Sequence, residues 1–92
     1  MKKIIILLLI ATVLLASISA LADSGIIVAT SGDTHIRTGP GLDYTSIGVL
    51  HRGQALYYTG FLSIDWRGVA WYEVYLDYGT AWVSSRYTTL YY

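Results

Sequence analysis

After residue 22, short runs of strand-forming residues alternate with glycine-containing turns. This alternation of short strands and turns predicts a small all-β fold. The runs cover residues 26–30, 34–37, 46–50, 54–62, 69–76 and 80–84. No window of this part of the chain has a sustained helical period. We expect a small, partly open β-barrel of five or six short antiparallel strands. The tyrosine-rich tail after Ser85 is expected to form a last strand or to fray.

The first 22 residues have the three-part layout of a secretory signal peptide. The parts are a basic start at residues 2–3, an apolar stretch at 4–18, and small residues at 20 and 22. We expect a signal-peptide helix over residues 1–22 that is cleaved before Asp23. Residues 23–92 then form one extracytoplasmic domain, whether secreted, periplasmic or associated with the cell wall. The alternative is an uncleaved anchor, because residues 4–22 are just long enough to span about 30 Å of hydrocarbon.

Composition and charge after residue 22 exclude several classes of protein. All the aromatic residues lie there, nine Tyr, three Trp and one Phe, and this content is far above that of disordered chains. This part of the chain has four arginines and six acidic residues, so its net charge is slightly negative. It contains no run of basic residues. Binding of nucleic acid through its phosphates is therefore disfavoured. The chain has no cysteine, and its fold must rest on its core without disulfides.

The polar residues do not form a recognisable catalytic or metal-binding set. His35 and His51 are the only histidines, and no serine lies in a nucleophile elbow. Two separated histidines and scattered aspartates do not supply the three or four ligands of a metal site. We expect no enzyme activity, no metal and no cofactor.

The aromatic side chains are the best candidates for a binding surface. Trp71 and Trp82 stand one position out of step with the apolar residues expected to face inward. We therefore expect both indoles on the outer or groove-facing side, as flat platforms for peptide or sugar rings. The alternative is that they cap an open end of the barrel. Tyr44, in the loop after Pro40, is a third candidate, whereas Trp66 lies in another loop and is expected to be outside the groove.

Two polar residues complete the predicted site. Arg37 either ties the loop that follows it to a carbonyl or to Asp43, or contacts a carboxylate of the ligand. Asp43 or Arg37 would place one polar contact at the rim. The predicted ligand-binding residues are Arg37, Asp43, Tyr44, Trp71 and Trp82.

A series of short segments follows a recognisable order: residues 35–41 (HIRTGPG), 47–50 (IGVL), 52–53 (RG), 71–74 (WYEV) and 82–85 (WVSS), together with Tyr44, Gly79 and Tyr87. In this order and spacing they resemble the bacterial SH3 domain family. The resemblance covers about residues 26–90. Thr34, His35 and Ala81 depart from it, standing where the family usually has Leu, Asn and Gly. The resemblance implies an SH3-like antiparallel barrel, and in extracytoplasmic members it implies binding of peptidoglycan or its peptides.

Together these features predict an exported, non-enzymatic binding module that recognises cell-wall peptidoglycan or short peptides through an aromatic groove. The alternative is a structural or interaction domain that docks an envelope or secreted protein and binds no wall polymer. Contact with a membrane is expected only if the N-terminal segment stays uncleaved, and contact with nucleic acid is not expected.

Overall fold

The computed structural model describes residues 24–92, which form an all-β fold. The elements in chain order are β1 (Ile26–Ala29), β2 (Thr34–Arg37), β3 (Ser46–Leu50), β4 (Ala55–Ile64), β5 (Ala70–Leu76), β6 (Gly79–Ser84), the 3-10 turn η1 (Ser85–Tyr87) and β7 (Thr88–Tyr91). The signal peptide and its helix predicted for residues 1–22 lie outside the described residues. Within 24–92, no helix is long and apolar enough to cross a bilayer.

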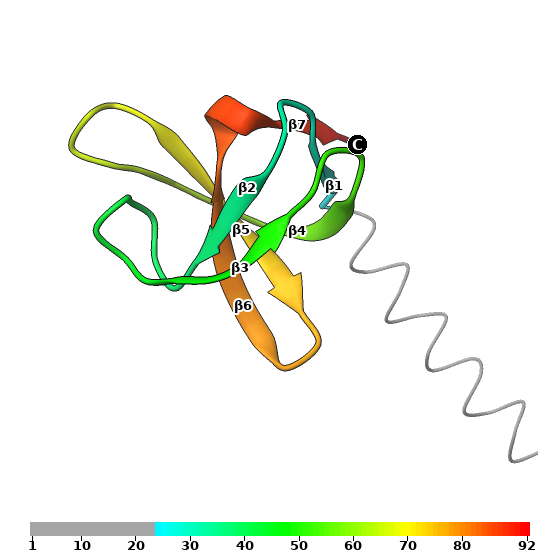
Figure 1. Ribbon diagram of the computed structural model, residues 1–92, viewed down its shortest axis with the longest axis horizontal. Helices are drawn as coiled ribbons and strands as arrows, with labels where there is room; N and C mark the ends of the chain where they lie inside the picture. Colours follow the sequence, from blue (N-terminus) through cyan, green and yellow to red (C-terminus); the bar gives the residue numbers. More distant parts are fainter. Residues whose placement is uncertain (1–23) are drawn as a thin grey trace, which may run out of the picture.

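The seven strands form one open antiparallel sheet in the order β3-β2-β6-β5-β4-β1-β7, which curls into the barrel of Figure 1. The all-β prediction is confirmed, and the structure has seven strands where five or six were predicted. The additional strand is β7, which pairs with β1 from Ile26↔Tyr91 to Ala29↔Thr88. It forms because the tail alternates: Thr88 and Leu90 turn toward the interior, whereas Thr89 and Tyr91 face solvent.

The core lies between the two halves of the curled sheet. Ile27, Tyr58, Val74 and Val83 are buried, and Leu56 and Leu90 are among the half-buried residues packed against them. Val74 therefore lies in the core, and Leu56 packs against it. The ring of Tyr58 meets Tyr72 edge to face, with ring centroids 5.3 Å apart, and burial raises the pKa of the Tyr58 hydroxyl. Because all these residues lie within 24–92, the domain has a core of its own.

Strand β4 bends in its middle and belongs to two parts of the sheet. The register with β5 shifts between Tyr58 and Leu62, and Gly60 lies there with a φ of 96°, which glycine adopts readily. Before the bend, β4 pairs with β1 and covers the core. After it, β4 and β5 continue as a hairpin that extends away from the barrel, drawn in yellow at the left of Figure 1.

Candidate functional site

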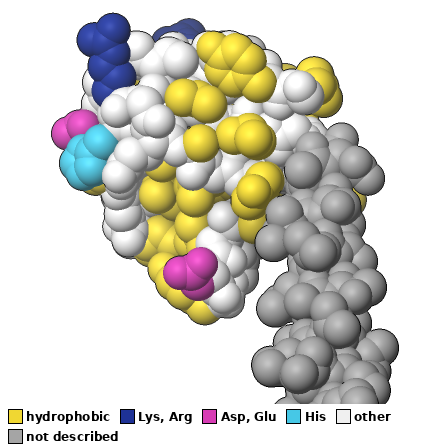
Figure 2. Space-filling model, turned by 90° about the vertical axis from the view of Figure 1, so that its right-hand side faces the viewer, with side chains coloured by type: hydrophobic (Ala, Val, Ile, Leu, Met, Phe, Trp, Pro, Cys, Tyr) yellow, Lys and Arg dark blue, Asp and Glu magenta, His cyan; other side chains and the backbone are white. Residues whose placement is uncertain are grey.

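Two hollows on the surface differ in chemistry. The smaller, about 170 Å³, is lined by Ile26, Ala55, Leu56 and Tyr57. Hydrophobic side chains are also widespread on the face drawn in Figure 2. The larger, about 250 Å³, is lined by Asp33, Thr34, His35, Arg37, Leu42, Trp71, Ser84 and Tyr87. Only the larger hollow combines apolar walls with groups of both charges, and we take it as the candidate site.

The strand register explains why β2, β5 and β6 contribute to one hollow. Arg37 pairs with Trp82 across β2 and β6, and Trp71 pairs with Ser84 across β5 and β6. Side chains at paired positions share a face of a sheet, and positions two apart do so as well. Arg37, Trp71, Trp82 and Ser84 therefore share the face opposite to Val74 and Val83. The sequence assignment of both tryptophans to that face agrees with this register.

Trp71 is nevertheless not an exposed platform, and this part of the prediction is wrong. Its side chain is 1 % exposed, and its indole Nε1 donates a hydrogen bond to Asp65 Oδ2 at 2.9 Å. Asp65, the acceptor of this bond, lies in the turn between β4 and β5. Trp71 thus forms part of the buried floor of the hollow, where it supports the site by packing.

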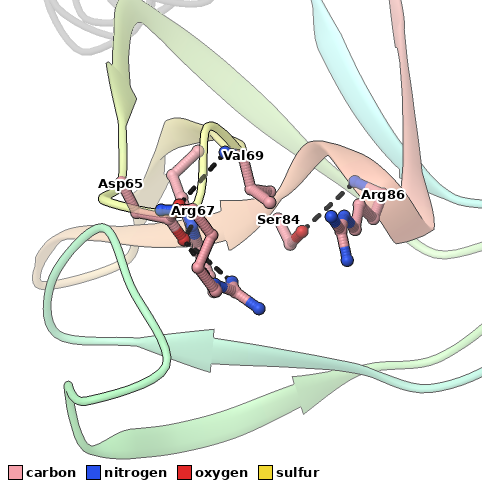
Figure 3. A network of polar contacts seen from close by, with 6 residues as sticks. Asp65, Arg67, Val69, Ser84 and Arg86 are labelled. Carbon is pink, nitrogen blue, oxygen red and sulfur yellow. Dashed lines mark hydrogen bonds and ion pairs between the residues drawn. The ribbon is translucent and has the colours of Figure 1, made fainter.

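The side chain of Asp65 organises the turn that contains Arg67 and Val69 (Figure 3). It accepts hydrogen bonds from the backbone N–H groups of Arg67 and Val69, and from the Arg67 guanidinium at 2.8 Å. Burial alone would raise the pKa of this carboxyl, but the hydrogen bonds from Trp71, Arg67 and Val69 hold it well below the ordinary value. Asp65 therefore stays ionised and fixes both the turn and the indole.

Arg37 holds the loop of residues 38–45 through a single hydrogen bond to its backbone. Its Nη1 donates to the backbone carbonyl of Tyr44 at 2.9 Å, so the carbonyl tie anticipated from sequence is present. Among the described residues the acidic partners in salt bridges are Asp33 and Asp65, bound to His51 and Arg67, so Arg37 has no carboxylate partner there. A guanidinium has five N–H donors, and most of those on Arg37 remain available at the hollow.

Tyr44 is held by glycine at the base of the same loop. A Cβ added at Gly39 would collide with the Tyr44 ring, whereas one at Gly41 would lie 3.5 Å from it, an ordinary contact. Gly39 is buried and lets the ring lie directly on the backbone, while the outer side of the ring stays exposed. The loop therefore presents an aromatic surface in a defined position.

The structure brings together only part of the predicted site. Arg37 and Trp71 line the hollow, Tyr44 is bonded to Arg37 through its carbonyl, and Trp82 is half-buried beside Arg37 in the ladder. Asp43 is exposed in the loop and does not line the hollow. A binding role for these five residues remains a proposal.

Sequence reasoning did not include several lining residues in the site, chiefly Leu42, Tyr87 and Asp33. Leu42 lies in the predicted loop, where a large apolar side chain was an available signal, and the structure shows it exposed. Tyr87 reaches the hollow because η1 is tied to the start of β2: its carbonyl accepts from Thr30 N at 3.0 Å and from Thr34 Oγ1 at 3.5 Å. No local sequence pattern encodes that approach.

Each of the two histidines contacts one polar side chain. His35 Nδ1 lies 2.8 Å from Ser46 Oγ, and His51 Nδ1 lies 2.7 Å from Asp33 Oδ1. Within residues 24–92 no three histidine or acidic side chains converge in a way that could hold a metal ion. The polar side chains that line the hollow include those of Asp33, His35 and Arg37.

Comparison with known proteins identifies the family. Over residues 32–89, more than half of its length, the chain matches the bacterial SH3 domain. No curated protein and no solved structure matches it. The matched region runs from the turn before β2 into β7 and includes all the residues that line the hollow. With this match and its all-β fold, the chain belongs to the bacterial SH3 domain family.

Proposed function

We propose that this domain is exported and binds cell-wall peptidoglycan, through its peptides, in the hollow beside Arg37. Bacterial SH3 domains are binding modules, often related to the cell wall. The observation that carries the proposal is one hollow that joins apolar walls to an arginine without a carboxylate partner and to a nearby aspartate.

The chemistry of the hollow suits a short peptide with a free end. The Arg37 guanidinium is placed to hold a carboxylate through paired N–H donors, and Asp33 offers a carboxylate to an amino group. Leu42 and Tyr87 supply apolar contact for a side chain. The volume of about 250 Å³ is below the roughly 300–1,000 Å³ of pockets for drug-sized ligands, so the hollow has room for one or two residues of peptide.

Export is supported by the sequence of residues 1–22, whose basic start, apolar stretch and small residues at 20 and 22 match a signal peptide. Peptidoglycan lies outside the cytoplasm, so export would bring the domain to its ligand. Mass spectrometry of the exported protein tests this part: a chain that begins at Asp23 supports it, and a retained N-terminal peptide supports the uncleaved anchor.

A non-catalytic role is supported by the family, whose members are generally binding domains, and by the character of the site. The lining residues include two serine or threonine hydroxyls, Thr34 and Ser84. Thr34 Oγ1 donates to a backbone carbonyl, and Ser84 Oγ accepts from Arg86 N at 3.2 Å, capping η1. Neither hydroxyl is paired with a histidine base in this arrangement.

The direct experiment is sedimentation of residues 23–92 with insoluble peptidoglycan. Arg37→Gln removes the guanidinium charge and its bond to the Tyr44 carbonyl, so urea unfolding of the variant is measured beside its binding. We expect Arg37→Gln to weaken retention by about tenfold or more, as truncations of central contacts do. Arg52→Gln, at an exposed position in the turn between β3 and β4 and outside the hollow, is the matched control and should bind as the parent does.

The second candidate function is the docking of an envelope or secreted protein without binding of wall polymer. It is favoured by the exposed Leu42, Tyr44 and Tyr87 around the hollow, because such aromatic and aliphatic anchors are typical of protein interfaces. A folded parent domain that fails to sediment with peptidoglycan would leave this candidate in place of the first.

A further inference from the structure

The hairpin that extends from the barrel carries large apolar side chains that are exposed to solvent. We name residues 61–68 the hairpin tip. Phe61 is 69 % exposed, Leu62 48 %, Ile64 58 % and Trp66 86 %. Apolar groups of this size rarely gather on a free surface without a binding role, and the hollow beside Arg37 does not use them.

The apolar residues lie on both faces of the hairpin tip. Leu62 pairs with Tyr72 and Ile64 with Ala70, so Leu62 and Ile64 point to one face, whereas Phe61 alternates to the other. Trp66 lies in the turn itself. A flat protein surface would cover only one of these faces. The distribution instead fits an environment that surrounds the tip on all sides.

The charges of the hairpin tip are neutralised within it. Asp65 and Arg67 are the only charged residues between 55 and 72, and they form an ion pair at 2.8 Å. The Asp65 carboxylate also accepts from the backbone N–H groups of Arg67 and Val69. Transfer of an isolated charge out of water is very costly, but a paired and hydrogen-bonded one is far less so.

Several backbone groups of the turn also have partners within it. Asp65 N donates to the carbonyl of Val69 and Gly68 N donates to that of Asp65, each at 2.9 Å. Unpaired backbone groups are what most strongly oppose entry of an irregular segment into an apolar medium. Here the turn brings its own hydrogen-bond partners.

From these features we infer that the hairpin tip inserts into the interfacial region of a lipid bilayer, with Trp66 as the leading side chain. Tryptophan is enriched at that depth, where its apolar ring and polar N–H are both accommodated. The residues after 22 carry a slightly acidic balance, and the tip is neutral, so binding should need no anionic lipid. Insertion uses a surface separate from the peptide hollow.

Sedimentation of residues 23–92 with vesicles of pure phosphatidylcholine tests this inference. Removal of the N-terminal apolar segment excludes its own affinity for lipid. We expect the parent domain to sediment with the vesicles and its tryptophan emission to shift to shorter wavelength. Trp66→Ser should lower the partition by about tenfold or more, as the loss of one large buried apolar side chain does.

The matched control is Tyr78→Ser, because Tyr78 is an equally exposed aromatic, 82 %, in the turn between β5 and β6. It should partition as the parent does. No sedimentation of the parent, equal losses in the two variants, or a Trp66-dependent dimer without vesicle binding would each overturn the inference. Trp66→Ser should still bind peptidoglycan and Arg37→Gln should still bind vesicles, so this inference and the wall proposal fail separately.

Discussion

The two loops beside Trp71 handle charge in opposite ways. The turn over 65–69 encloses Asp65 with hydrogen bonds from three residues and an ion pair to Arg67. The loop over 38–45 is held by Arg37 through one backbone carbonyl, and the guanidinium keeps its other donors. A closed polar network provides rigid support, whereas an incompletely used charge at a hollow is available to a ligand. Asp65 and its partners therefore support the site, whereas Arg37 is expected to bind the ligand.

The largest effect on stability should come from Trp71, which belongs to the residues that support the site. Trp71→Ala should destabilise the domain by about 3–5 kcal/mol, since truncation of a buried aromatic leaves a cavity and also removes the donor to Asp65. Urea unfolding of the purified domain measures this. Trp71→Phe keeps most of the packing and should cost much less. A stable Trp71→Ala variant with only its binding impaired would restore Trp71 to the role of an exposed platform.

The next effect concerns Asp65 and acid stability. The folded pKa lies below the ordinary value of 3.8, so the carboxylate contributes stability above that pH, and the contribution is lost as the pH falls below it. Asp65→Asn turns an amide donor toward the donors of Trp71 or Arg67 and should lower the urea midpoint at neutral pH. Its stability should then fall less than that of the parent between about pH 4 and pH 2. Parallel pH profiles for the two proteins would disprove the role given to Asp65.

A smaller effect is expected at the base of the other loop. Gly39→Ala introduces a Cβ against the Tyr44 ring, and because the ring is half exposed it can move aside at a cost of about 1 kcal/mol. Displacement of the ring should weaken sedimentation with peptidoglycan. Gly41→Ala places its Cβ at an ordinary distance and should leave both stability and binding near those of the parent. Equal behaviour of the two variants would mean that the position of Tyr44 does not matter.

The smallest effect on folding should come from Trp66. Its side chain is almost fully exposed, so Trp66→Ala should change the free energy of unfolding by no more than about 0.5 kcal/mol and leave retention by peptidoglycan unchanged. Thermal unfolding and the sedimentation assay measure the two quantities. Loss of wall binding in Trp66→Ala, with Arg37→Gln unaffected, would move the binding site to the hairpin tip.

Much of the fold could be predicted from sequence because its signals are local. Alternation in the run that contains Val74 and glycine-containing turns between runs indicate strand positions. The sequence did not decide whether the tail forms a strand. The Thr88–Tyr91 segment pairs with β1, which lies about sixty residues earlier in the chain. Pairing over such a separation is not visible in the local pattern.

The site was less predictable for the same physical reason. The face of Trp71 followed from alternation, but its burial did not, and neither did the hydrogen bond of its indole to Asp65, six residues earlier. Tyr87 joins the hollow through hydrogen bonds to Thr30 and Thr34, more than fifty residues away. Periodicity gives the direction of a side chain, whereas burial also depends on what the loops place above it.

The most direct measurement of the central claim is an NMR titration of residues 23–92 with muropeptides. The account predicts that the largest chemical-shift changes cluster around the hollow: in the segment from Asp33 to Leu42, at the Trp71 indole N–H, and at Ser84 and Tyr87. The amides of the hairpin tip should change little. Saturable shifts confined to the tip, or to the hollow lined by Ile26 and Tyr57, would contradict the claim that the hollow beside Arg37 binds the peptide.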